Sequence, residues 1–134
     1  DTYNFCLVMF KIEFLPMVQE SLGSQGYAQL LASLSEGIRK HIRYEDYKFA
    51  LDRGRFIVLL PMTDQEYLMT LTDRIRHALV DIPSQDGKGG ELNLVIRAGA
   101  LVFAKEQFSQ YEDADAVIAA LERNTETDLI GEYI

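Results

Sequence analysis

The pattern of apolar and polar positions predicts several β-strands. Residues 5–14 form a nearly continuous apolar run of strand length, which is typical of a buried strand. Residues 47–51 alternate apolar and polar side chains, and residues 56–60 are apolar throughout. The charged turn 52–55 separates these two segments, so they predict an antiparallel hairpin in which Gly54 supplies the positive φ of a short turn.

Other segments have the three- to four-residue periodicity of amphipathic helices. These segments are 27–42, 63–82 and 113–123. A shorter helix is expected to begin at Pro16, which is tolerated in a first turn, and to end at Gly23 and Gly26. Thr63, with Glu66 three residues later, predicts a capping box at the start of the third helix.

The order of these elements predicts the fold class. Residues 92–103 form a further buried strand, residues 84–90 a polar loop, and residues 129–134 a last edge strand. The expected fold is an α/β sandwich of the α+β type, with a central mixed five-stranded sheet flanked by helices. A doubly wound parallel sheet is disfavoured because residues 47–60 leave no room for a crossover helix.

Composition and charge narrow the class of protein. A chain of 134 residues with 48% hydrophobic content can bury one core, so residues 1–134 are expected to form a single domain. The net charge of −8 disfavours nucleic acid and anionic membranes as partners, although a local basic patch could hold a phosphate.

The lone Cys6 permits no intrachain disulfide, which fits a reducing cytosol. No apolar run is long enough for membrane insertion, and the start at Asp1 just before a strand suggests a domain cut from a longer protein.

Four segments carry a family resemblance that extends over nearly the whole chain. Residues 5–23 resemble a first strand followed by D-x-D-x-F-K-x-x-N-D-x-x-G, and residues 56–64 (FIVLLPMTD) are similar to F-x-x-L-L-P-x-T-D. Residues 72–76 (TDRIR) are similar to A-E-R-I-R, and residues 97–100 (RAGA) stand where S-I-G-V is usual. In this order and spacing the segments resemble the GGDEF domain, the diguanylate cyclase family that makes cyclic di-GMP from two GTP.

The resemblance implies that the catalytic signature is lost. The five signature positions hold Asp52, Arg53, Gly54, Arg55 and Phe56, of which only the phenylalanine is retained. The family's two metal-binding acids fall on Gly54 and Lys11. Neither residue can replace the oxygen ligands that hold Mg²⁺ during phosphoryl chemistry. We therefore expect no cyclase activity, no cofactor and no metal.

Other positions that the resemblance assigns to the substrate have also changed. The guanine-contacting residues fall on Gln19 and Ala28. The phosphate-contacting lysine falls near Leu121, and Glu13 alone keeps a carboxylate near the site. Each step of GTP cyclisation has thus lost a participant.

The same resemblance implies that a second site is retained. The family's inhibitory site is an R-x-x-D turn that binds cyclic di-GMP, and it matches Arg43 and Asp46, with Arg74 as the supporting arginine. An arginine can pair with a phosphate or with guanine, and an aspartate can accept from the N1 and N2 hydrogens of guanine. Additional contacts could come from Tyr44, Tyr47 and Arg76. The alternative is a solvated turn with a surface ion pair of little energetic consequence.

These features lead to one leading hypothesis and two alternatives. The leading hypothesis is a catalytically inactive, cytoplasmic, bacterial GGDEF-like domain that binds cyclic di-GMP and controls exopolysaccharide secretion or biofilm formation. It would act by docking to neighbouring domains or to a partner subunit, and it could be the cytosolic part of a membrane-anchored protein. The alternatives are a nucleotide-free dimerisation or docking module, and a domain that still binds GTP or cyclises it.

At the hairpin tip, Arg53 and Arg55 could bind phosphates or discourage edge-to-edge association.

Overall fold

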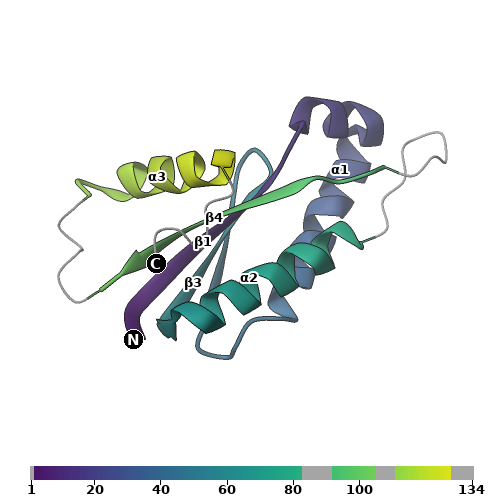
Figure 1. The fold of residues 1–134 in the computed structure, drawn as a ribbon. Helices are drawn as coiled ribbons and strands as arrows, with labels where there is room; N and C mark the ends of the chain where they lie inside the picture. The colour runs from purple at the N-terminus through teal and green to yellow at the C-terminus, as the bar shows by residue number, and fades with distance from the viewer. Residues whose placement is uncertain (1, 83–91, 105–110, 128–134) are drawn as a thin grey trace.

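The computed structural model describes residues 2–82, 92–104 and 111–127, which form a sheet with helices on both faces. The elements in order are β1 (Thr2–Ile12), α1 (Leu15–Arg39), β2 (Tyr47–Leu51), β3 (Arg55–Asp64), α2 (Gln65–Val80), β4 (Ile96–Phe103) and α3 (Ala114–Thr127). Helices α1 and α2 cover one face of the sheet, and α3 covers the other (Figure 1). The α+β class and the antiparallel hairpin predicted from the sequence are confirmed.

The described strands lie in the order β2-β3-β1-β4, and every neighbouring pair is antiparallel. The expectation of a mixed sheet is therefore corrected for these strands. Each helical crossover joins two strands that run in the same direction, but a third strand lies between them, so no parallel pair forms. The described sheet has four strands where five were expected, and the predicted strand 129–134 and loop 84–90 lie outside the described residues.

Strand β1 lies in the middle of the sheet and contributes to two separate cores. Val8, Phe10 and Ile12 pack with the helices of one face, whereas Met9 packs with α3 on the other. All four are at most 2% exposed. Because both faces of β1 are covered, its sequence is apolar at consecutive positions instead of alternating.

Helix α1 contains a break where the sequence predicts the boundary between two helices. Gly23 has φ 71° and ψ 173°, a conformation outside the helical region that glycine adopts readily. The segments before and after Gly23 run in different directions (Figure 1). None of the helices in the described ranges combines the length and the apolar character needed to cross a membrane.

The start of α2 differs from the predicted capping box. Strand β3 continues to Asp64, whose side chain accepts a hydrogen bond from the Tyr67 amide at 2.8 Å and caps the helix. Thr63 is a strand residue that is only 1% exposed. The prediction was wrong because Thr63 and Asp64 are both good caps, and the sequence does not show where the strand ends.

Candidate functional site

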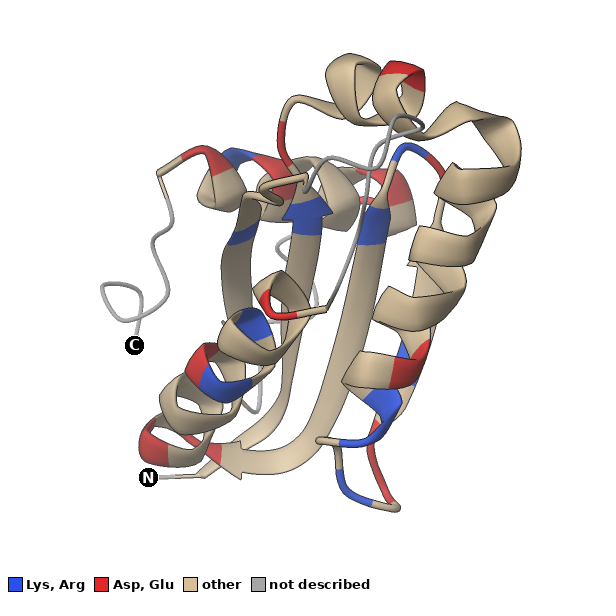
Figure 2. Ribbon diagram, turned by 90° about the vertical axis from the view of Figure 1, so that its right-hand side faces the viewer, with Lys and Arg blue, Asp and Glu red and all other residues tan. Residues whose placement is uncertain are grey.

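A row of basic side chains crosses the sheet at the C-terminal end of β1. Lys11 is directly opposite both Arg55 on β3 and Arg97 on β4. Directly opposite side chains of antiparallel strands lie on the same face, so these three residues form one row, called here the basic row (Figure 2). The row lies on the face that α3 covers, because Lys11 and Met9 are two residues apart on β1.

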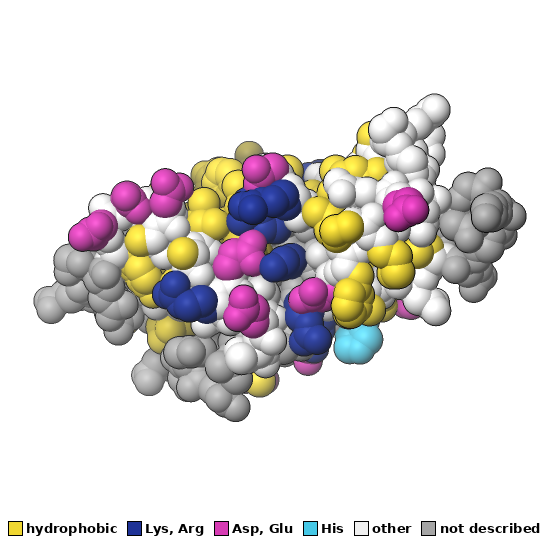
Figure 3. Space-filling view, turned by 90° about the horizontal axis from the view of Figure 1, so that it is seen from above, with side chains coloured by type: hydrophobic (Ala, Val, Ile, Leu, Met, Phe, Trp, Pro, Cys, Tyr) yellow, Lys and Arg dark blue, Asp and Glu magenta, His cyan; other side chains and the backbone are white. Residues whose placement is uncertain are grey.

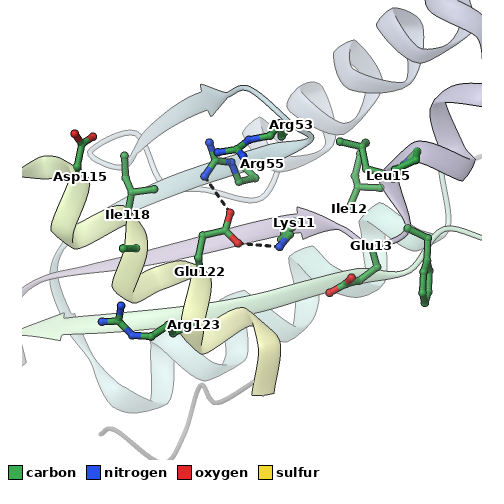
Figure 4. Close-up of a pocket in the computed structure, with 13 residues that line it drawn as sticks. Lys11, Ile12, Glu13, Leu15, Arg53, Arg55, Asp115, Ile118, Glu122 and Arg123 are labelled. Carbon is green, nitrogen blue, oxygen red and sulfur yellow. Dashed lines mark hydrogen bonds and ion pairs between the residues drawn. The ribbon is translucent and has the colours of Figure 1, made fainter.

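Carboxylates from two elements separate the charges of the basic row. Glu122 on α3 accepts hydrogen bonds from Lys11 Nζ at 2.8 Å and from Arg55 Nη1 at 3.0 Å (Figure 4). Glu13, just after β1, pairs with Arg97 Nε at 2.9 Å. Like charges directly opposite one another destabilise a sheet, so these carboxylates allow the row to exist.

The hairpin turn adds a further acid to the cluster. Arg55, whose side chain is 8% exposed, pairs with Asp52, and this hydrogen bond lowers the pKa of Asp52. Burial tends to raise the pKa of Glu122, but hydrogen bonds from Lys11 and Arg55 outweigh it and lower the pKa overall. Burial tends to lower the pKa of Arg55, but Asp52 and Glu122 raise it overall. These shifts all favour the charged forms of Asp52, Arg55 and Glu122, so the three groups form ion pairs near neutral pH.

An open groove of about 710 Å³ lies between the hairpin tip, the start of α1 and α3. Its charged lining includes Lys11, Glu13, Arg53, Arg55, Glu122 and Arg123. Basic and acidic side chains lie next to one another across this face instead of forming a patch of one sign (Figure 3). The volume is in the range of small-molecule sites, but much of the charge in the groove is already paired.

The side chains at this groove do not fit the divalent metal that the family's reaction would require. The two positions implied for the metal-binding acids lie together, since the Ile12 amide donates to the Gly54 carbonyl oxygen at 3.0 Å. Lys11 would repel a cation, and Glu122 is already bonded to Lys11 and Arg55. Within the described ranges, no group of three or more His, Cys, Asp and Glu side chains could hold a metal.

The other substrate positions implied by the resemblance do not line the groove. Gln19 and Ala28 are exposed on α1, on either side of the break at Gly23. Leu121 is fully buried in the core under α3, whereas Glu122 and Arg123, which follow it, line the groove. The residue at the position implied for the phosphate-contacting lysine therefore does not reach the groove.

The R-x-x-D turn, residues 43–46, forms a closed ion pair. The Asp46 carboxylate accepts from the Arg43 amide at 2.7 Å, from Nη2 at 2.9 Å and from Nε at 3.1 Å. The Asp46 side chain is 0% exposed and the Arg43 side chain 30% exposed. Hydrogen bonding to Asp46 raises the pKa of Arg43. In this conformation Asp46 holds Arg43 and has no exposed oxygen for a ligand.

Arg43 is held in addition by the end of β3 and the start of α2. Its Nη2 donates to the Pro61 carbonyl oxygen at 2.9 Å and to the Thr63 hydroxyl at 2.8 Å. The guanidinium carbon lies 4.5 Å from the centre of the Tyr67 ring, a cation–π distance. Burial raises the pKa of Tyr67, and the charges of Arg43 and Arg74 act in the opposite direction. The fold thus brings Arg43 and Arg74 into the surroundings of the same tyrosine.

The additional contact residues predicted from the sequence lie at the surface. Tyr44 is fully exposed, and Tyr47 on β2 is 60% exposed. Arg76 pairs with Asp73 on α2, at 3.4 Å.

Sequence reasoning missed several residues of the two sites. These residues are Glu122, Arg97, Thr63 and Tyr67. The available signal was a charge in an otherwise apolar strand: Arg97 interrupts β4, and a partly buried charge requires a partner. Nothing in the sequence names that partner as Glu13.

The fold is similar to that of solved GGDEF structures. The diguanylate cyclase SiaD from Pseudomonas aeruginosa, solved with its activator SiaC, is 17% identical with a TM-score of 0.76, over 92% of this chain and 45% of that chain. The GGDEF domain of FimX from Pseudomonas aeruginosa is 15% identical with a TM-score of 0.76, over 92% of this chain and 74% of that chain. The GGDEF domain of DgcB from Caulobacter crescentus, solved with c-di-GMP, is 17% identical with a TM-score of 0.71, over 91% of this chain and 73% of that chain. This chain spans less than half the length of SiaD, and identities this low show the fold alone.

Comparison with curated protein sequences gives no match. The family model described as "Diguanylate cyclase, GGDEF domain" matches residues 1–127, which is nearly the whole chain. The match agrees with the shared fold and with the order of segments noted in the sequence. The chain therefore belongs to the GGDEF domain family.

Proposed function

We propose that this chain is a catalytically inactive GGDEF domain that regulates through binding of cyclic di-GMP at the surface around Arg43 and Arg74. The observation that carries the proposal is the basic row, which places Lys11 at one of the two positions where the family's reaction needs a metal-binding carboxylate, with Arg55 and Arg97 directly opposite it. Membership in a family that makes cyclic di-GMP supports the class of ligand.

The backbone at Gly54 gives a second reason for inactivity. A Cβ added to Gly54 would lie 3.1 Å from Leu15 Cδ1 and 3.2 Å from Ile12 Cδ1, at a φ of +68° that disfavours other residues. An aspartate there would be crowded as well as strained. Returning the missing acid to this position alone would therefore not rebuild a metal site.

The surface around Arg43 supports the binding half of the proposal. In the part of the chain that the structure describes, the hydrogen bonds of the Arg43 side chain use Nε and Nη2 and leave Nη1 for a ligand. Arg74 is exposed and lies two helical turns from Tyr67 on the same helix. Two arginines near one tyrosine suit a ligand with two phosphates and two purine rings. Asp46 then positions Arg43 and does not itself contact guanine.

Regulation would follow from a difference in affinity between two states of the domain. The solved complex of SiaD with its activator shows one cyclase of this fold bound to a partner protein. By analogy, cyclic di-GMP would change how this domain docks to a neighbouring domain or partner subunit. Control of exopolysaccharide secretion or biofilm formation is the output that this proposal includes.

Calorimetric titration with cyclic di-GMP tests the binding half. We expect a saturating binding isotherm for the native chain and about tenfold lower affinity for Arg74→Ala. Arg39→Ala, which changes an exposed arginine on α1, should bind with the native affinity. Arg74→Ala is the informative variant because Arg74 is exposed, whereas loss of Arg43 would leave the buried Asp46 without its partner. No heat from the folded native chain, or equal binding by Arg74→Ala, would overturn this half and favour the nucleotide-free docking module.

Incubation with GTP and Mg²⁺ or Mn²⁺ tests the catalytic half. We expect no cyclic di-GMP by chromatography, with an active diguanylate cyclase in the same buffer as the positive control. Appreciable product would contradict the argument from Lys11 and Gly54, whatever the calorimetry shows.

A further inference from the structure

We propose that β2 is a self-pairing edge, through which two copies of this chain form a two-fold symmetric dimer with one continuous antiparallel sheet. Strand β2 is at one end of the strand order, and no strand in the described ranges pairs with its outer edge. The unpaired N–H and C=O groups of such an edge are a template for another strand.

The side chains of β2 leave apolar surface uncovered. Tyr47 is 60% exposed and Phe49 is 48% exposed. Both lie on the same face as Leu51, which packs against the core under α3. Pairing of two β2 strands would extend this face across the dimer and cover part of it with the same three side chains of the second copy.

The usual protection of an edge strand is weak in β2. Its sequence, YKFAL, contains no proline and only one charged residue, Lys48. The Lys48 ammonium turns back to α1, where it donates to the Ser35 hydroxyl at 2.7 Å and to the Ser35 carbonyl oxygen at 3.2 Å. The charge that would keep another strand away is therefore engaged within the same molecule.

Charge complementarity identifies a second copy of the chain as the partner. Full antiparallel pairing of a five-residue strand with its own copy is centred on Phe49, so Tyr47 faces Leu51 of the second copy. Glu45 and Arg53 lie in the turns at the two ends of β2, so the same register brings Glu45 of one copy close to Arg53 of the other, twice across the two-fold axis. Glu45 is exposed, and the Arg53 side chain is 73% exposed with its only described pairing at 3.8 Å, to Asp52.

The like charges that this register also brings together are already neutralised. Asp46 would approach Asp52 of the second copy, but the Asp46 side chain is fully buried against Arg43. Asp52 is bonded to Arg55 within its own hairpin. The net effect at the edge is therefore attraction between Glu45 and Arg53.

Sedimentation equilibrium of the 134-residue chain measures the association. We expect a monomer–dimer equilibrium in the high-micromolar range, because a five-residue edge makes a small interface. Glu45→Lys and Arg53→Glu each place like charges opposite one another at two points, so each should weaken the dimer about tenfold. Glu126→Lys, the same change on an exposed position of α3, is the matched control and should leave the dimer intact.

Two rescue arms separate this register from other modes of association. The double variant Glu45→Lys/Arg53→Glu restores both attractive pairs and should dimerise like the native chain. An equimolar mixture of the two single variants should also recover association, because the mixed dimer pairs Lys with Glu on one side and Arg with Glu on the other. Circular dichroism confirms that each variant is folded. A monomeric native chain at millimolar concentration, a dimer that neither single variant weakens, or a weakened dimer that neither rescue arm restores overturns the proposal.

Discussion

The R-x-x-D turn and the basic row both hold arginines with carboxylates, but they are built in opposite ways. In the turn, one fully buried carboxylate binds one arginine and its amide three residues earlier in the chain. In the basic row, three cations from three strands depend on acids from α3, the end of β1 and the hairpin turn. The turn is a local structure, and the row exists only once the tertiary fold has formed.

Because of this difference, we expect the turn to contribute mainly to the stability of the fold and the basic row to affect mainly what the groove can bind. The Asp46 side chain is inaccessible, so the energetic role of the R-x-x-D turn is to connect the approach to β2 with the end of β3. The basic row borders an open groove and changes what that groove can bind. We therefore expect the largest losses of stability from the turn and smaller ones from the row.

Asp46→Ala should have the largest effect. It leaves the Arg43 amide and guanidinium without their acceptor in a partly buried place, so we expect a loss of about 3 kcal/mol in the free energy of unfolding. Urea denaturation measures this loss. Asp73→Ala is the matched control, since it also removes an aspartate paired with an arginine three residues away, but one that is 61% exposed. Equal effects of the two substitutions would contradict the structural role assigned to Asp46.

Gly99→Ala should come next, because it disturbs the support of the basic row without touching the turn. A Cβ at Gly99 would lie 2.5 Å from the Thr125 amide nitrogen and 2.7 Å from the Asn124 carbonyl carbon, so α3 must move. We expect a loss of about 2 kcal/mol, measured in the same way. Gly37→Ala in α1 is the control. Its Cβ would meet the ends of two side chains, at 3.1 and 3.2 Å, and alanine has a higher helix propensity than glycine.

Glu122→Gln should cost about 1 kcal/mol at pH 7, since it removes the charge shared by Lys11 and Arg55. The lowered pKa of Glu122 in the folded state fixes the pH dependence. Its stabilisation is fully present above the ordinary glutamate pKa of about 4.3, and is lost as the pH falls through the lowered value. The difference between native chain and variant should therefore be full at pH 7 and vanish at a pH below the lowered pKa of Glu122. Urea denaturation at both pH values measures it.

Glu126→Gln, on an exposed position of the same helix, controls for a general effect of charge on α3. It should show no such pH dependence.

In a Gly99→Ala background, Glu122→Gln should lower the free energy of unfolding by less than it does in the native chain, because a displaced α3 has already weakened the same contacts. Full additivity of the two changes would argue that α3 does not position Glu122.

The sequence predicts local structure in this molecule better than contacts between residues that are far apart in the chain. The hairpin and the break at Gly23 follow from turn residues and short-range patterns, and the R-x-x-D turn was singled out by the family resemblance. The antiparallel order of β1 between β3 and β4 does not, because each crossover pattern is equally compatible with a parallel neighbour. The pairing of Lys11 with Glu122 joins residues 111 positions apart, and no periodicity encodes such a contact.

The smallest effect is expected from Arg53→Ala, and the adjacent Arg55 gives the contrast. The Arg53 side chain is 73% exposed with one long contact to Asp52, so its removal should change the free energy of unfolding by less than about 0.5 kcal/mol. Arg55 is 8% exposed and also donates to the Asp52 carbonyl oxygen at 3.0 Å, so Arg55→Ala should cost more than Arg53→Ala in urea denaturation. Two arginines separated by one glycine would thus be distinguished by the contacts that tertiary structure gives them. An equal, small loss for both would show that the basic row contributes little to folding and matters only for what the groove excludes.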